Sequence, residues 1–151
     1  MEIHLMLGVA GSGKSTYVNN MVSKSAYPFQ ILCLDDIRLA LGDVYDIRTE
    51  PVVRMISDVM GRAYMERKLP IVVDSTCSSL KIAEMWCRLA KKYGYETHGI
   101  YLDTPFDVCC DRRVEKIAME VLIRQRDGVA DLLQFTDNLF DKFKIVKYKK
   151  E

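Results

Sequence analysis

The chain has 151 residues, of which 49% are hydrophobic and 28% are charged, and its formal net charge is +1. This length and composition predict a single globular domain over 1–151, and the near-neutral charge excludes a global field that attracts nucleic acid or membranes. No apolar run approaches the ~20 residues of a membrane span. Five cysteines without metal-ligand spacing, in a chain without a signal peptide, predict reduced thiols and a cytoplasmic location, and the oligomeric state stays open.

Apolar runs and helical periodicities alternate along the chain. In chain order we predict a strand at 3–8, a helix at 14–24, a strand at 29–34, helices at 36–42 and 51–68, a strand at 71–73, a helix from 78 or 79 to 94, a strand at 97–102, helices at 105–113, 119–126 and 131–140, and a strand at 143–148. This alternation indicates an α/β three-layer fold around a parallel sheet of about five strands. Ligands bind such sheets at the carboxyl ends of the strands.

The first strand runs directly into a glycine-rich loop, 8–16 (GVAGSGKST). Glycine, four residues and then Gly-Lys-Ser is the spacing of a loop whose backbone N–H groups surround phosphates, and a strand before it and a helix after it are the context that this motif requires. Lys14 is expected to reach the β- and γ-phosphates of ATP or another nucleoside triphosphate, Ser15 to ligate Mg²⁺, and Thr16 to lie near the α-phosphate. The predicted nucleotide-binding residues are Gly8, Ala10, Gly11, Ser12, Gly13, Lys14, Ser15 and Thr16.

Other motifs separate the classes of nucleotide-binding protein. A GTPase requires DxxG directly after a strand and NKxD for guanine, and the sequence has neither. A motor or AAA-type ATPase requires a hydrophobic run followed by Asp-Glu; 31–36 imitates this pattern, but the rest of the chain is too short for such a domain. A phosphoryl-transfer enzyme requires a base for the acceptor hydroxyl, a group that binds the acceptor, and positive charge over the γ-phosphate.

Four residues fit these last requirements. Asp35 follows the second predicted strand and Arg38 lies one helical turn beyond it, so they can supply the base and the acceptor contact. Arg112 and Arg113 can supply the positive charge. Each has an ordinary alternative, because Asp35 can cap the following helix and the two arginines can be surface charges. We favour catalysis for Asp35 and interpret Asp36 as the cap.

The same motifs, in the same order, resemble those of the small P-loop kinases typified by the 5′-hydroxyl kinase domain of bacteriophage polynucleotide kinase. The loop at 8–16 is similar to the family's GxPGSGKST, with Ala10 in place of proline. The run 35–38 (DDIR) resembles its DDxR, and 74–76 (DST) resembles the motif after its third strand. The run 103–105 (DTP) resembles the DxP that opens its lid, the segment in which Arg112 and Arg113 fall.

This resemblance implies roles and a topology. Asp35 would be the general base, Arg38 would bind a phosphate of the acceptor, and Lys14 with a lid arginine would stabilise the transferred phosphoryl group. Asp74 and Thr76 would lie beside the phosphate loop and help to hold the acceptor or Mg²⁺ waters, although Asp74 can also cap a turn. The implied strand order is 2-3-1-4-5, adenylate-kinase-like with a short lid.

The sequence therefore predicts a Mg²⁺- and ATP-dependent kinase that acts on the 5′-hydroxyl of a DNA or RNA end. A kinase for a nucleoside, nucleotide or metabolite is the alternative that the near-neutral charge favours, and a non-catalytic nucleotide-binding module is a third possibility. His4 and His98 are interpreted as core or edge positions. The basic strand at 143–148 is interpreted as protection of a sheet edge, with contact to a nucleic-acid backbone as the alternative.

Overall fold

A computed structural model describes residues 1–42, 46–113 and 116–150. The strands are β1 (Glu2–Leu7), β2 (Gln30–Cys33), β3 (Ile71–Asp74), β4 (Glu96–Asp103) and β5 (Lys142–Lys147). The helices are α1 (Lys14–Ser23), α2 (Leu34–Ala40), α3 (Glu50–Glu66), α4 (Leu80–Tyr93), α5 (Phe106–Arg113), α6 (Met119–Leu133) and α7 (Thr136–Leu139).

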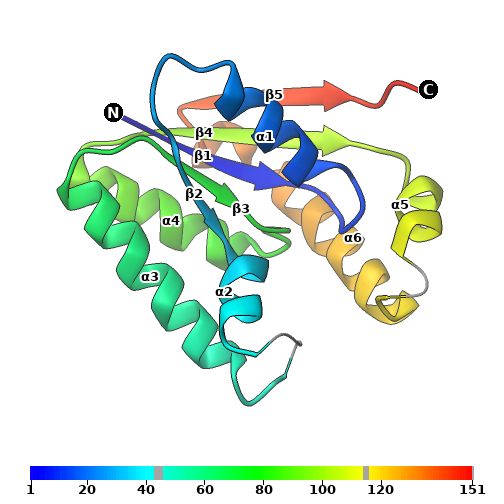
Figure 1. The fold of residues 1–151 in the computed structure, drawn as a ribbon. Coiled ribbons are helices and arrows are strands. Elements are labelled where there is room, and N and C mark those ends of the chain that lie inside the picture. Colours follow the sequence, from blue (N-terminus) through cyan, green and yellow to red (C-terminus); the bar gives the residue numbers. More distant parts are fainter. Residues whose placement is uncertain (43–45, 114–115, 151) are drawn as a thin grey trace.

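The five strands form one parallel sheet in the order β2-β3-β1-β4-β5, which confirms the predicted fold class and topology. This order places the carboxyl end of β1 between the ends of β3 and β4 (Figure 1). The phosphate loop that follows β1 therefore lies next to the segment after β3, and α2, which follows β2, is one strand further out.

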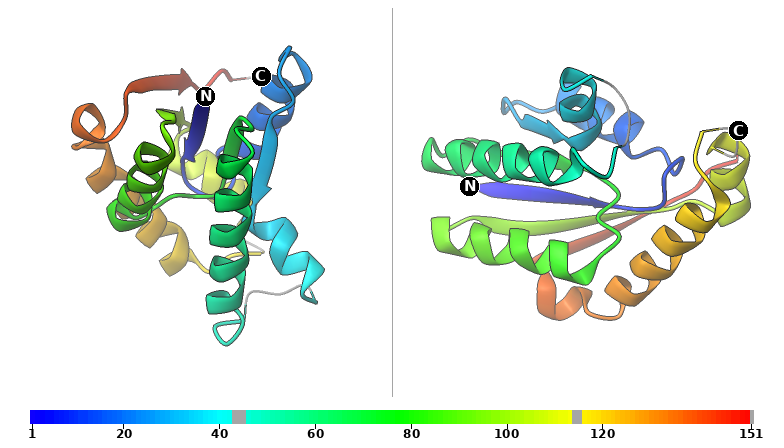
Figure 2. Two further views of the ribbon diagram at one scale, coloured as in Figure 1. Left: turned by 90° about the vertical axis from the view of Figure 1, so that its left-hand side faces the viewer. Right: turned by 90° about the horizontal axis from the view of Figure 1, so that it is seen from below.

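Two apolar clusters cover the two faces of the sheet. On one face Ile3, Leu5 and Leu7 of β1 belong to the cluster that includes α3, α4 and the end of α6. On the other face Met6 packs with Val18 of α1. Figures 1 and 2 show the same separation, with α1 above the sheet and α3 and α4 below it. Because both faces are covered, β1 and β3 are apolar almost throughout.

The single tryptophan closes the contact between α3 and α4. Trp86 of α4 is buried, and its ring lies against Gly61 of α3, where an added Cβ would be 2.6 Å from the ring. Gly61 therefore provides the space that lets the two helices approach with a large aromatic side chain between them.

One helix boundary was predicted wrongly. We expected separate helices at 119–126 and 131–140, but α6 runs without a break from Met119 to Leu133 and is followed by the short α7. An added Cβ at Gly128 would lie 1.9 Å from the carbonyl oxygen of Ser78. Gly128 therefore permits close packing of α6 against the loop before α4 and does not end the helix.

The start of α2 also differs from the prediction. Asp36 was expected to cap this helix, but α2 begins at Leu34 with Cys33 as its N-cap residue. Asp35 and Asp36 both lie in the first turn, where a carboxylate interacts favourably with the helix dipole. Asp35 is thus held on a helix rather than at the end of a strand.

Two further sequence predictions concern the cysteines and the membrane. All five cysteines are free thiols, as predicted. In the part of the chain that the structure describes, no helix combines the length and the apolar character needed to cross a bilayer.

Candidate nucleotide and phosphoryl-transfer site

The phosphate loop turns into α1 at Gly13. The backbone of Gly13 has φ 95°, in the left-handed region that favours glycine, and this residue is the N-cap of α1. Lys14, the first residue of α1, folds back so that its ammonium donates to the carbonyl oxygens of Gly8 at 2.9 Å and Val9 at 3.0 Å. The loop is therefore closed around the lysine that was predicted to contact the β- and γ-phosphates.

Gly11 lies directly against α5. Its φ is 86°, and an added Cβ would be 2.9 Å from Arg113 Cγ and 2.9 Å from the carbonyl oxygen of Cys109. We expect Gly11→Ala to lower the free energy of unfolding by about 2 kcal/mol or more, because backbone strain adds to a collision with a main-chain atom. Denaturant unfolding measures this loss.

Gly13→Ala is the matched control for that substitution. Its φ of 95° imposes similar backbone strain, but a Cβ at Gly13 would meet no heavy atom within 4 Å among the described residues. Gly13→Ala should therefore lower the free energy of unfolding by about 1–2 kcal/mol, through backbone strain alone. Equal losses in the two variants would contradict the close packing of α5 on Gly11.

Ser15 and Asp74 meet where β1 and β3 end. Ser15 Oγ donates to Asp74 Oδ2 at 2.7 Å. Burial raises the pKa of the Asp74 carboxyl, while the Ser15 hydrogen bond and the Lys14 charge oppose that rise. Hydroxyl and carboxylate oxygens are the donors that Mg²⁺ prefers, so this pair fits the ion that the sequence predicts at Ser15. Thr76, also predicted for this region, is half-buried in the loop after β3.

The Lys14 ammonium is strongly affected by its surroundings. Burial lowers its pKa to about 8, against the opposing effect of the Asp74 carboxylate. The free protein therefore loses this charge as the pH rises through about 8. Phosphate groups bound beside Lys14 would favour the ammonium, so we expect nucleotide binding at pH 8 to take up roughly half a proton that is not taken up at pH 6.

Calorimetry in buffers of different ionisation enthalpy measures that proton uptake. Lys14→Arg is the control, because a guanidinium stays charged at pH 8 and has no proton to gain. The difference between wild type and Lys14→Arg isolates the lysine from titration of the nucleotide itself. The same uptake in both proteins would show that Lys14 is not the group that titrates.

Hydrogen bonds join Asp35 in the first turn of α2, Arg38 in its last turn, and Glu50 at the start of α3. Arg38 Nε donates to Glu50 Oε1 at 2.6 Å and Nη2 donates to Glu50 Oε2 at 3.0 Å, while Nη1 donates to Asp35 Oδ1. The Glu50 side chain is buried, whereas the Asp35 side chain is 87% exposed. Hydrogen bonds from Arg38 hold the pKa of Glu50 below its usual range. The buried, paired Glu50 thus fixes Arg38, and Arg38 holds the exposed Asp35 carboxylate.

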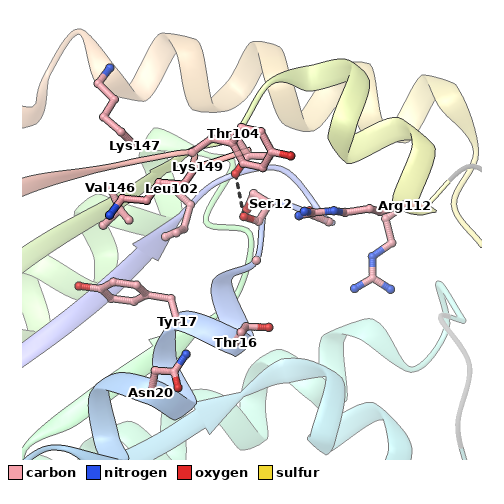
Figure 3. Close-up of a pocket in the computed structure, with 14 residues that line it drawn as sticks. Ser12, Thr16, Tyr17, Asn20, Leu102, Thr104, Arg112, Val146, Lys147 and Lys149 are labelled. Carbon is pink, nitrogen blue, oxygen red and sulfur yellow. Dashed lines mark hydrogen bonds between the residues drawn. The ribbon is translucent and has the colours of Figure 1, made fainter. Parts of the chain in front are cut away.

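A pocket of about 650 Å³ extends from the phosphate loop to the end of β5. Figure 3 shows Tyr17 and Asn20 of α1 on one side and Thr104 and Lys147 on the other. Thr104 Oγ1 donates to the Ser12 carbonyl oxygen at 2.8 Å and so joins the segment after β4 to the loop. Aromatic and basic side chains on its walls suit a flat, electron-rich ring such as a nucleobase.

The two predicted lid arginines occupy different places. Arg112 donates to the Gly11 carbonyl oxygen at 2.9 Å, and its guanidinium lies 5.9 Å from the centre of the Tyr148 ring, on the wall of the pocket. Arg113 lies against Gly11, and its charge is among those that lower the pKa of Lys14. Within the described residues, Arg113 Nε is buried without a hydrogen-bond partner. Both arginines line the pocket and lie beside Gly11, Arg112 through its hydrogen bond and Arg113 through packing.

Three residues in this region were not found from the sequence. Glu50 gave no signal, because a glutamate at a helix start is common. Gln125 of α6 accepts a hydrogen bond from the Ala10 backbone N–H at 3.0 Å, a donor that a proline at this position would lack. Tyr148 follows β5 and lines the pocket. Only the strand order, with β5 beside β4, brings that residue near the loop.

Comparison with known proteins identifies the family. A family model described as an AAA domain matches residues 3–129, which is most of the chain. The chain belongs to this AAA-domain family. A comparison with curated proteins finds no match.

Solved structures show the fold of this AAA-domain protein. It is similar to a chain of the Pnkp1/Rnl/Hen1 RNA repair complex, with a TM-score of 0.74 and 20% identity over 93% of this chain and 46% of that one. It is also similar to a structure from the PezAT toxin-antitoxin system of Streptococcus pneumoniae, with a TM-score of 0.77 and 16% identity over 97% of this chain and 66% of that one. A third similar structure is a gluconokinase from Sinorhizobium meliloti 1021, with a TM-score of 0.62 and 17% identity over 99% of this chain and 84% of that one.

These likenesses establish a P-loop kinase-type fold for the AAA-domain protein. The chain spans less than half the length of the RNA repair chains that it matches. From the sequence we set aside a motor or AAA-type ATPase because of the length of the chain, whereas the matching family model is described as an AAA domain.

Proposed function

We propose that this chain is an ATP-dependent kinase that transfers the γ-phosphoryl group to the 5′-hydroxyl of a DNA or RNA end. The observation that carries the proposal is the exposed Asp35 carboxylate, held by Arg38 on the helix after β2, with Lys14 close enough that the two charges interact. The order of motifs supports a polynucleotide acceptor, and so does the shared fold with a chain of an RNA repair complex.

In the proposed reaction Asp35 accepts the proton of the attacking hydroxyl. The hydroxyl oxygen forms a bond to the γ-phosphorus, and the bond from that phosphorus to the β–γ bridging oxygen breaks, leaving ADP. Lys14 and Arg113 stabilise the charge that develops on the transferred group. Ser15 and Asp74 would hold Mg²⁺, which when bound neutralises phosphate charge.

A small-molecule acceptor is the second candidate. Glu50 already occupies one edge of the Arg38 guanidinium with two hydrogen bonds, and Asp35 takes a third. This leaves Arg38 fewer donors for a phosphate of the acceptor than the resemblance implies. That arrangement, together with the net charge of +1, favours a nucleoside, nucleotide or metabolite. Fold neighbours include a gluconokinase and a shikimate kinase.

A transfer assay distinguishes these candidates. ATP labelled at the γ-phosphate is incubated with 5′-hydroxyl DNA and RNA oligonucleotides, 3′-mononucleotides, nucleosides and sugars. The proposal expects labelled oligonucleotide ends. Transfer to a mononucleotide or metabolite with none to any oligonucleotide supports the second candidate, and ATP binding without transfer to any acceptor supports a non-catalytic module.

A further inference from the structure

Both histidines of the chain meet on the sheet, at the end opposite to the phosphate loop. β1 begins Glu2-Ile3-His4 and β4 begins Glu96-Thr97-His98, and the two strands pair in the register Glu2↔Glu96 and His4↔His98. The repeated Glu-x-His therefore places two carboxylates and two imidazoles on one face of neighbouring strands. The imidazole rings are stacked, with centroids 4.5 Å apart. In Figure 1 this is the end of β1 marked N.

The charges of this group are only partly balanced. Carboxylates directly opposite each other on neighbouring strands repel. Lys142 pairs with Glu96 at 2.8 Å. Within 1–42, 46–113 and 116–150, the ion-pair contacts of Glu2 go to the histidines alone, with Glu2 Oε1 at 3.3 Å from His4 Nε2 and Glu2 Oε2 at 3.7 Å from His98 Nε2.

His4 is the least satisfied member of the group. It is 9% exposed, and among the described residues its Nδ1 has no partner, while its Nε2 has the 3.3 Å contact with Glu2 but no partner in hydrogen-bond geometry. A buried imidazole without a partner loses its hydrogen bonds to water and gains none in return.

One pair of these atoms already has the spacing of ligands around one metal ion, and the third atom lies close enough to join them by a small side-chain movement. Zn²⁺ bonds of about 2.0–2.1 Å in a tetrahedral site place neighbouring ligand atoms about 3.3 Å apart. His4 Nε2 and Glu2 Oε1 are 3.3 Å apart, and one ligand atom from each of Glu2, His4 and His98 lies within 4.8 Å of the other two. Imidazole and carboxylate together are ligands typical of Zn²⁺ and related transition metals.

We propose that Glu2, His4 and His98 form a binding site for Zn²⁺ or a similar divalent transition-metal ion. The Glu96 carboxylate, which contacts His98 Nε2, would turn toward the ion as the fourth ligand. A divalent ion here would satisfy His4, relieve the repulsion between Glu2 and Glu96, and tie the start of β1 to β4. The site is independent of the proposed kinase reaction, because it lies at the opposite end of the strands.

Titration of the whole chain with Co²⁺, followed by competition with Zn²⁺, tests this site. With excess Mg²⁺ present to occupy the Ser15–Asp74 site, we expect one Co²⁺ per chain, with d–d absorption bands of a low-coordinate site. No thiolate-to-cobalt charge-transfer band should appear, because binding to the free cysteines would produce one. His98→Gln and Glu2→Gln should each weaken binding by at least about tenfold. Glu84→Gln is the matched control, because it removes an exposed carboxylate of α4 that belongs to neither site, and it should leave this affinity unchanged.

A second measurement needs no substitution. Since the chain has two histidines, long-range ¹H–¹⁵N spectra of the imidazoles resolve both rings, and Zn²⁺ should shift one nitrogen of each at one equivalent. The proposal is overturned if no stoichiometric binding occurs, if a thiolate band appears, or if Zn²⁺ leaves both imidazoles unshifted. Unchanged affinity in His98→Gln and Glu2→Gln, with both variants folded by thermal melting, also overturns it.

Discussion

Asp35→Asn is expected to lower kcat for phosphoryl transfer by about 10²–10⁴-fold, while the affinity for ATP stays within about twofold of wild type. The amide keeps the shape of the carboxylate and can still accept the hydrogen bond from Arg38, but it cannot take a proton from the attacking hydroxyl. Single-turnover transfer to the best acceptor of the assay measures kcat, and nucleotide titration measures the affinity.

Glu50→Gln is the companion variant, and it should have a smaller effect. The amide accepts only one of the two Arg38 hydrogen bonds, so Arg38 and, through it, Asp35 are held less firmly. We expect about a tenfold loss in kcat, because Glu50 positions another residue and does not contact the proton in transfer. Unchanged turnover in Asp35→Asn would contradict the proposed base, whatever Glu50→Gln does.

Arg113→Ala is expected to lower kcat by about 10²–10³-fold, the loss typical when one group that stabilises transition-state charge is removed. Arg113 lies against Gly11 of the phosphate loop, and its charge is close enough to Lys14 to lower the pKa of that ammonium, so we expect it to act on the transferred phosphoryl group. Steady-state kinetics with ATP as the varied substrate separate this effect on kcat from an effect on KM.

Arg112→Ala is the matched control, because it removes the same charge from the adjacent position. Arg112 lies on the wall of the pocket, beside Tyr148 and bonded to the Gly11 carbonyl oxygen. Its loss should raise KM for ATP by several-fold through weaker binding of the nucleoside end, with kcat within about threefold of wild type. If the two variants exchange these effects, the assignment of the two arginines is reversed.

The sequence predicted the α/β fold class and the strand–loop–helix around the glycine-rich loop because both depend on local patterns, whereas the strand order was implied by the family resemblance. Buried parallel strands are read as apolar runs, and the spacing of Gly8, Gly13 and Lys14 is a backbone requirement confined to a few adjacent residues. Asp74 could be placed beside the loop once the strand order was known, and the structure confirms that neighbourhood through its bond with Ser15.

The contacts that the sequence did not predict join residues far apart in the chain. Glu50 meets Arg38 only because α3 packs on α2, and Gln125 reaches Ala10 across 115 residues of sequence. The helix α6 was predicted in two parts, and the role of Gly128, room for the Ser78 carbonyl, depends on a distant segment. Local sequence patterns do not identify partners that are distant in the chain, so these side-chain contacts between elements could be found only in the structure.

Trp86 gives the protein a single built-in optical probe. The chain has one tryptophan, and it is enclosed between α4 and Gly61 of α3, away from the residues that line the pocket. Its emission should therefore report the packing of α3 and α4 and shift to longer wavelength only when that packing is lost. The same fluorescence measurement therefore shows whether α3 still packs on α4 in every variant whose turnover has fallen, so that a loss of activity can be separated from a loss of fold.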